Sequence, residues 1–216
     1  METLEKYYAR RAAEYEKIFD KPERQADLAR MRVDIPRLFV NQRVLEIACG
    51  TGYWTPLIAE QAESVLATDF NEEPLSIAKS KTYRKANVSF ARADAYALPD
   101  WKNGFSACYA GFWWSHVLLS RLDSFLGHLA TRLEKGARVA FMDNRYVEGS
   151  STPVSRKDAE GNGYQTRRLA DGSSHEVLKN FPTPAELRAR LGRFGTEVAV
   201  TEYQYYWVAS YRIMAG

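Results

Sequence analysis

Two glycines close to the end of an apolar stretch are the residues most readily tied to ligand binding. Residues 44–54, VLEIACGTGYW, run from a predicted buried strand into Gly50 and Gly52. Glycine has no Cβ, so its backbone can turn sharply and approach a ligand closely. The same Gly-x-Gly pattern also occurs in ordinary strand-to-helix turns, so by itself it leaves both interpretations open.

Acidic residues around these glycines narrow the choice of ligand. A dinucleotide-binding fingerprint has a third glycine three residues after the second, but this chain has Thr55 there. Glu46 lies four residues before the first glycine, while Asp69 and Asp94 end the next two predicted strands. A carboxylate at a strand end can accept hydrogen bonds from two ribose hydroxyls, or from the exocyclic amine of an adenine. The spacing therefore favours an adenosyl ligand over a dinucleotide.

Alternating strands and helices must position these groups. Strands are predicted at 43–48, 64–69, 87–92, 105–111 and 137–143, with helices near 53–62, 73–82 and 120–134. Such alternation requires a parallel sheet with right-handed crossovers. Outside this core, the pattern predicts helices at 2–19, 23–39 and 183–193 and strands at 196–202 and 204–213.

Three segments, VLEIACGTGYW, VLATDF and ARADAYALP, resemble in order and spacing the cofactor motifs of class I S-adenosylmethionine-dependent methyltransferases. The resemblance covers residues 40–145 closely and implies an α/β, Rossmann-like fold. Its seven-stranded, mostly parallel sheet would have helices on both faces and an antiparallel last strand. We expect one domain, 1–216, with an N-terminal helical lid (1–39), a cofactor-binding core (40–143), a substrate-side hairpin insertion (144–182) and a terminal helix and strand pair (183–216).

The resemblance implies S-adenosyl-L-methionine as cofactor and S-adenosyl-L-homocysteine as product. The glycines would pass close to the methionine part, Asp69 would bind the ribose, and Asp94 would frame the adenine. Many members have a glycine where this chain has Ala48. The expected cofactor-binding residues are Tyr8, Arg11, Tyr15, Glu46, Ala48, Gly50, Gly52, Asp69, Phe70, Asp94, Ala95 and Gly111.

The N-terminal segment YYARRAAEY, residues 7–15, resembles a helix that folds over the cofactor in the small-molecule branch, which includes ubiquinone and menaquinone methyltransferases. Tyr8, Arg11 and Tyr15 lie at i, i+3 and i+7, so one helical face can present all three. Arg11 would pair with the cofactor carboxylate. Alternatively the tyrosines are core residues and Arg11 is solvated, and Tyr7 competes with Tyr8 for the same role.

Ligands of open α/β sheets lie beyond the carboxyl ends of the strands. Among the residues there, His116 is the predicted general base, because a neutral imidazole accepts a proton near neutral pH. The aromatic residues either line a substrate pocket or pack in the core. Substrate-side candidates are Trp113, Trp114, Asn144, Arg145 and Arg168.

The insertion contains a predicted β-hairpin, GYQTRRLADGSSHEVLKNF, around an Asp171-Gly172 turn. A two-residue turn places Arg167 opposite Glu176. Because Arg167 would then have a structural partner, Arg168 is the candidate for binding an anionic group.

Composition and charge exclude several other classes. The net charge is only +3 and the basic residues are dispersed, which argues against a nucleic-acid or membrane surface. The chain has no apolar signal core and no run of 18 apolar residues, so we expect a cytoplasmic location and no membrane span. Cys49 and Cys108 are predicted to be reduced thiols. No residues have metal-ligand spacing, so we expect a metal-independent enzyme.

The sequence therefore predicts an S-adenosylmethionine-dependent methyltransferase that acts on a small-molecule acceptor by in-line methyl transfer. One alternative is an RNA or other nucleic-acid methyltransferase, although AGFWWSH after the fourth strand lacks the Asn/Asp-Pro-Pro-aromatic motif of base-amine methylation. A second alternative is a non-catalytic S-adenosylmethionine-binding module. The sequence predicts neither the acceptor atom nor the oligomeric state.

Overall fold

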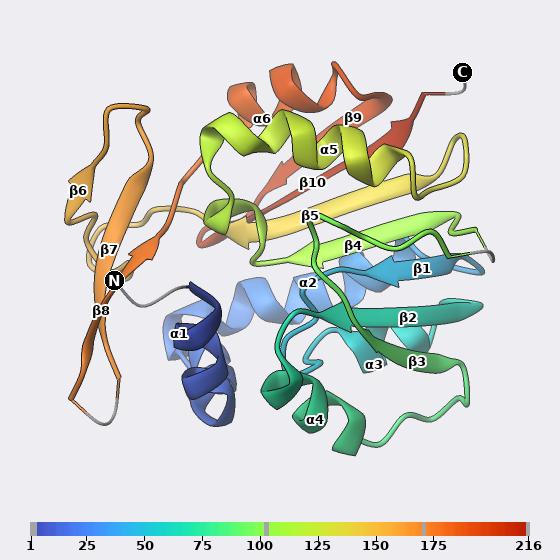
Figure 1. The fold of residues 1–216 in the computed structure, drawn as a ribbon, viewed down its shortest axis with the longest axis horizontal. Helices are drawn as coiled ribbons and strands as arrows, with labels where there is room; N and C mark the ends of the chain where they lie inside the picture. Colours follow the sequence, from blue (N-terminus) through green and yellow to red (C-terminus); the bar gives the residue numbers. More distant parts are fainter. Residues whose placement is uncertain (1–3, 102–103, 170–171, 215–216) are drawn as a thin grey trace.

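A seven-stranded sheet forms the centre of the computed structural model, which describes residues 4–101, 104–169 and 172–214 (Figure 1). The strand order is β3-β2-β1-β4-β5-β10-β9, parallel from β3 to β5 and antiparallel at β10 and β9. This is the sheet that the resemblance implied. Its strands are β1 (Arg43–Glu46), β2 (Ser64–Asp69), β3 (Val88–Arg92), β4 (Ala107–Gly111), β5 (Arg138–Asn144), β9 (Gly195–Glu202) and β10 (Tyr206–Ile213).

Apolar side chains cover both faces of this sheet. On β1, Leu45 packs in a cluster with α5 and α6, whereas Val44 packs in a second cluster with α2 and α3. Such two-sided burial explains the continuous apolar runs of the central strands. The helices are α2 (Gln25–Arg37), α3 (Thr55–Ala59), α4 (Glu72–Ser80), α5 (Leu122–Ala130) and α6 (Pro184–Leu191), with the 3₁₀ turns η2 (Pro22–Arg24), η3 (Trp114–His116) and η4 (Leu119–Arg121).

The N-terminal segment differs from the single predicted helix. It forms α1 (Leu4–Arg11) and then a 3₁₀ helix, η1 (Ala12–Phe19). The tighter 3₁₀ winding changes which side chains share a face. The rings of Tyr8 and Tyr15 lie 6.1 Å apart across the change of winding, edge to face. The segment lies beside the end of the sheet where β4 and β5 end (Figure 1).

The insertion forms its own antiparallel sheet, of β6 (Arg156–Lys157), β7 (Gly163–Arg168) and β8 (Ser174–Leu178), next to α1 (Figure 1). The predicted pairing of Arg167 with Glu176 is wrong, because Arg167 lies opposite His175 and Thr166 lies opposite Glu176. The N–H of Leu169 donates to the carbonyl of Ser173 (3.0 Å), so the hairpin loop is one residue longer than a two-residue turn. The predicted turn residue Asp171 lies outside the described residues.

Both cysteines are free thiols, as predicted: Cys49 lies in the glycine loop and Cys108 is buried in β4. Across the described parts of the chain, no helix is both long and apolar enough to span a membrane.

Candidate active site

The loop between β1 and α3, the glycine loop, is held in a left-handed conformation. The φ angles of Ala48, Gly50 and Gly52 are +51°, +57° and +74°. A Cβ on Gly52 would lie 2.9 Å from the Cβ of Ala78 on α4, so only glycine fits there. No atom lies within 4 Å of a Cβ built on Gly50, so the loop faces open space there. The positive φ of Ala48 also explains why a glycine suits that position.

Asp69, the last residue of β2, fixes this loop. Its Oδ2 accepts a hydrogen bond from the N–H of Gly50 (2.9 Å), and its Oδ1 accepts one from the N–H of Asn71 (2.9 Å). Burial raises the pKa of the Asp69 carboxyl above its ordinary value, although these hydrogen bonds act in the opposite direction. Each carboxylate oxygen can accept a second hydrogen bond, so Asp69 retains capacity for a ligand.

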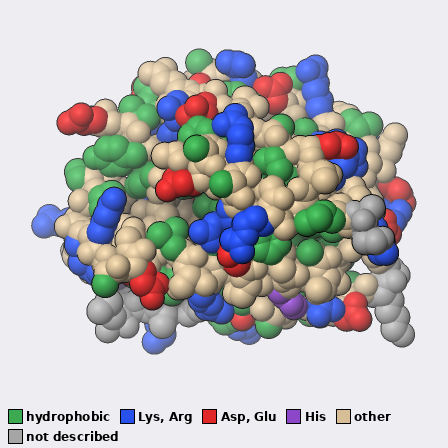
Figure 2. Space-filling view, turned by 90° about the horizontal axis from the view of Figure 1, so that it is seen from above, with side chains coloured by type: hydrophobic (Ala, Val, Ile, Leu, Met, Phe, Trp, Pro, Cys, Tyr) green, Lys and Arg blue, Asp and Glu red, His purple; other side chains and the backbone are tan. Residues whose placement is uncertain are grey.

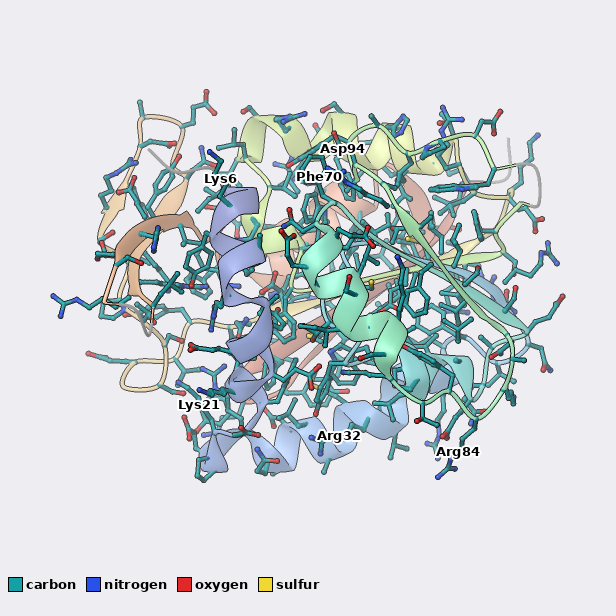
Figure 3. The ribbon with its side chains drawn as sticks, turned by 60° about the horizontal axis from the view of Figure 1, so that its bottom comes forward. Lys6, Lys21, Arg32, Phe70, Arg84 and Asp94 are labelled. Carbon is teal, nitrogen blue, oxygen red and sulfur yellow. The ribbon has the colours of Figure 1, made fainter. Side chains whose placement is uncertain are left out.

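A cavity of about 270 Å³, the glycine-loop cavity, lies beside Asp69. It brings together nine of the twelve predicted cofactor residues, among them the carboxylates of Asp69 and Asp94. Figure 3 shows Phe70 and Asp94 near the amino end of α4. The nine residues are Tyr8, Tyr15, Ala48, Gly50, Asp69, Phe70, Asp94, Ala95 and Gly111.

Three predicted cofactor residues do not line this cavity. Gly52 packs against α4, as described above. Glu46 is buried beneath the loop, where burial raises its pKa to about 8. The guanidinium of Arg11 lies over the rings of Tyr7 and Tyr15, 5.8 and 5.6 Å from their centroids, and lines a different cavity.

His116 lies on the wall of the glycine-loop cavity at the end of η3. Its Nδ1–H donates to the carbonyl oxygen of Leu178 (2.6 Å), so its Nε2 is the acceptor for the hydroxyl of Tyr8 (2.7 Å). Burial and the nearby positive charge of Lys179 lower the pKa of His116 well below its ordinary value. The imidazole is therefore neutral at physiological pH, with its lone pair on Nε2.

A buried ion pair lies next to His116. The Nζ of Lys179, at the end of β8, donates to Asp143 Oδ1 (2.7 Å) and to the hydroxyl of Ser115 (2.6 Å). The N–H of Ser115 also donates to Asp143 Oδ2 (3.0 Å). Burial alone would raise the pKa of Asp143, but the charge of Lys179 lowers it instead. These bonds join β5, η3 and the insertion, and so fix the backbone that carries His116.

A second cavity of about 530 Å³, the basic cavity, adjoins the first, and Tyr8, Tyr15 and Phe112 line both. Among the described residues, Glu14 is the one acid on its wall. Asn144 lines it as predicted and accepts a hydrogen bond from Arg24 (2.9 Å). The basic residues on its wall are Arg11, Lys17, Lys21, Arg24, Arg167, Arg168 and Lys179.

Trp113 lines the glycine-loop cavity, but two other substrate-side candidates reach neither cavity. Trp114 packs in the core, with its ring centroid 5.1 Å from that of Phe141, and borders a separate cavity of about 730 Å³ near α6. Arg145 donates to the carbonyl oxygen of Tyr203 (2.6 Å) and pairs with Glu202. Both are structural in this arrangement.

Sequence reasoning missed four residues of these cavities. Lys179 and Arg24 come from segments far from the glycine loop, and nothing in their local sequence marks them. Arg121 lines the glycine-loop cavity with its guanidinium 3.7 Å from the ring centroid of Tyr96, which lines the same cavity. Tyr96 follows Asp94 by two residues, so its position beside the predicted adenine site was the one available signal.

Comparisons with known proteins agree with this geometry. The model of the methyltransferase domain family matches residues 44–136. The chain is 36% identical over 74 residues to the demethylmenaquinone methyltransferase of Lactococcus lactis subsp. lactis (strain IL1403), covering 32% of this chain and 29% of that protein. It is 30% identical over 113 residues to the demethylmenaquinone methyltransferase of Clavibacter sepedonicus, covering 52% and 43%. The matches thus span less than half of these relatives.

Solved structures match over nearly the full length. The DhpI-SAH complex structure has 28% identity and a TM-score of 0.74, covering 98% of this chain and 95% of that one. The DhpI-SAM-HEP complex has 26% identity and a TM-score of 0.75, covering 97% and 99%. In sheet order, matched domain and overall structure, the chain is similar to class I S-adenosylmethionine-dependent methyltransferases.

Proposed function

We propose that the chain binds S-adenosylmethionine in the glycine-loop cavity and transfers its methyl group to a small molecule in the basic cavity. One observation carries this proposal: Tyr8 lines both cavities, and its hydroxyl donates to the neutral His116 on the wall of the glycine-loop cavity. Both DhpI complexes, which are similar to this chain over its length, contain SAM or SAH. The demethylmenaquinone methyltransferases matched by part of the chain are also small-molecule enzymes by name.

The groups lining the glycine-loop cavity fit this cofactor. The carboxylates of Asp69 and Asp94 provide acceptors for ribose hydroxyls and an adenine amine, and Phe70 provides an apolar surface for a ring. Trp113 lines the same cavity, and its Nε1–H is buried without a partner among the described residues. When bound, S-adenosylmethionine supplies an activated methyl group.

His116 then acts as the general base. Its Nε2 accepts the proton of the acceptor as the acceptor attacks the methyl group, in the place where it now accepts the proton of Tyr8. The hydrogen bond to the Leu178 carbonyl holds the imidazole in this tautomer. The walls of the two cavities orient the reactants, and orientation of this kind lowers a barrier by roughly 7–11 kcal/mol.

Calorimetry with S-adenosylhomocysteine, together with transfer of a radiolabelled methyl group to a metabolite panel, tests this function. We expect the wild-type chain to bind S-adenosylhomocysteine and to label at least one acceptor. Loss of a general base should lower the rate constant of His116→Gln by roughly 10²- to 10⁴-fold with unchanged S-adenosylhomocysteine affinity.

The matched control is His128→Gln, because His128 lies on α5 and lines neither cavity. We expect its rate constant to equal that of the wild type. Binding of S-adenosylhomocysteine without transfer to any acceptor would favour the binding-module alternative, and absence of binding would refute the cofactor assignment.

A further inference from the structure

Arg167 lines the basic cavity with a charge that lacks a carboxylate partner. Its guanidinium donates from Nη2 and Nε to the neutral Oε1 of Gln165, at 2.8 and 3.2 Å. Within the described parts of the chain, it forms no ion pair, and its other electrostatic neighbours are the phenols of Tyr8 and Tyr7. Gln165 is itself held, since its Nε2 donates to the carbonyl oxygen of Thr152 (2.5 Å). The guanidinium of Arg167 also forms hydrogen bonds with the phenols of Tyr7 and Tyr8, so uncharged groups orient it and leave its positive charge uncompensated.

Several other arginines of the chain are paired with acids. Arg156 on β6 makes two hydrogen bonds to Glu176 (2.7 and 2.5 Å), and Arg190 and Arg193 both pair with Asp123. On the outer face shown in Figure 2, basic and acidic side chains lie beside one another. An unpaired cation that is largely enclosed is costly, because burial removes its water without replacing it by an opposite charge. A bound anion would supply that charge.

The rest of the basic cavity has the same charge excess. Arg24 is buried, but it donates to the neutral groups of Asn144 and Ser150. Lys179 is neutralised by Asp143, so it adds little free charge. Arg24, which is buried, and Arg167, which is partly buried, are thus two guanidinium groups of this cavity that have no acidic partner among the described residues. Two guanidinium forks of this kind suit a compact oxyanion.

The position of this charge relative to His116 limits the size of the ligand. Tyr8 contacts His116 directly, with a ring centroid distance of 5.3 Å, and it also neighbours Arg167. One side chain thus separates the base from the guanidinium. A ligand that spans the two needs only a short chain between its anionic group and its nucleophile.

We propose that the methyl acceptor is a small acid, whose carboxylate or phosphoryl-type oxyanion is bound by Arg167 in the basic cavity while a nearby hydroxyl or amine faces His116. This assignment of substrate class rests on the function proposed above. Arg24 contributes the second guanidinium, and Tyr7 lines the cavity on the side of α1. The nucleophile displaces the hydroxyl of Tyr8 from Nε2 of His116, gives its proton to that nitrogen and takes the methyl group, releasing S-adenosylhomocysteine.

Binding and turnover with matched acceptor sets test this proposal. One set contains short hydroxycarboxylates, a second contains hydroxyalkyl phosphates, and a third contains neutral diols and amides of the same length. Calorimetry in the presence of S-adenosylhomocysteine measures binding, and labelled methyl transfer measures turnover. We expect one of the two acidic sets to bind and to accept the methyl group, and the neutral set to do neither. Which acidic set is active shows whether the anionic group is a carboxylate or a phosphoryl group.

Arg167→Gln should weaken the dissociation constant and raise the KM for the acid by about 10- to 100-fold, the usual effect of losing a charged hydrogen-bond donor, with a smaller change in kcat. His116→Gln should instead lower kcat. Arg156→Gln, in the same small sheet but outside the cavity, is the matched control and should leave both constants unchanged. Unchanged S-adenosylhomocysteine affinity shows that Arg167→Gln is folded.

Equal binding of acids and neutral compounds by the wild type, or an unchanged KM in Arg167→Gln, would overturn the substrate class. So would a wild type that binds S-adenosylhomocysteine and methylates only neutral acceptors. These outcomes leave the proposed methyltransferase function intact. A wild type that does not bind S-adenosylhomocysteine would instead refute that function, so the two failures are distinguishable.

Discussion

The two adjoining cavities of this protein differ in charge and in how the chain builds them. The glycine-loop cavity carries the carboxylates of Asp69 and Asp94, and most of its wall comes from one segment, residues 48–121. The wall of the basic cavity comes mostly from three separate segments, residues 7–24, 144–152 and 165–181, and the first and third of these supply its cations. One cavity therefore suits a ligand that offers hydrogen-bond donors, and the other suits a ligand that carries negative charge.

The basic cavity depends on the buried ion pair of Lys179 and Asp143, which joins the insertion to β5. We expect Lys179→Met to lower the free energy of unfolding by about 3–5 kcal/mol, because it leaves the Asp143 carboxylate buried without its counter-charge. Urea denaturation measures this change. The double variant Lys179→Met/Asp143→Asn should recover most of the loss. A single variant as stable as the wild type would show that the pair does not hold the insertion against β5.

Beneath the glycine loop, the buried Glu46 carboxyl is held in its protonated, uncharged form at neutral pH. Its native pKa of about 8 lies far above the ordinary value of 4.5, so between these pH values the native state holds one proton more than the unfolded chain. The free energy of unfolding therefore falls as the pH rises through this window. Glu46→Gln lacks this titration and should become more stable than the wild type as pH rises from 5 to 8, by about 2–4 kcal/mol.

Chemical denaturation at several pH values measures that difference. Glu63→Gln, an exposed residue just before β2, is the matched control and gives the background effect of removing a carboxylate. If Glu46→Gln and Glu63→Gln shift stability equally at every pH, Glu46 is not the protonated group that its burial indicates.

The glycine-loop cavity could be predicted from sequence because its constraints are local. Gly52 is required because α4 approaches the loop closely. Asp69, the last residue of β2, accepts a hydrogen bond from the N–H of Gly50. The alternation of elements predicted a parallel sheet, and the family resemblance implied its seven strands and the antiparallel strand at its end. The structure changed only the bounds of these elements by a few residues.

The basic cavity could not be predicted in the same way, because its groups meet only after distant segments pack. Lys179 reaches Asp143 from 36 residues further along the chain. On β7, one extra residue in the hairpin loop moves the register by one position, which takes Glu176 away from Arg167 and removes the reason for preferring Arg168 to Arg167 as the anion-binding candidate. Turn length is weakly encoded when the turn residues allow more than one loop.

Asp69 gives the next test of the comparison, because it binds both the loop and, in our proposal, the ligand. Asp69→Asn keeps one oxygen acceptor where two backbone N–H groups now donate. We expect the dissociation constant for S-adenosylhomocysteine to rise by about 10- to 100-fold, the effect of losing a charged acceptor. The Asp94 carboxylate accepts from one backbone N–H among the described residues, that of Tyr96, so Asp94→Asn should cost less than tenfold. Calorimetry compares the two, and equal losses would contradict a special role for Asp69.

The smallest effect is expected at Ala48, because an alanine occupies a left-handed backbone position of the glycine loop. A left-handed φ of +51° costs an alanine about 1–2 kcal/mol, whereas glycine adopts it freely at the expense of about 0.5–1 kcal/mol of chain entropy. Ala48→Gly should therefore raise the free energy of unfolding by roughly 0.5–1 kcal/mol, or Tm by about 2–4 °C. Ala189→Gly, at an exposed position of α6, should lower the free energy of unfolding by about 1 kcal/mol. A rise in Tm for Ala48→Gly with a fall in Tm for Ala189→Gly would indicate backbone strain at position 48. An equal fall in Tm for both variants would show that alanine is not strained in the glycine loop.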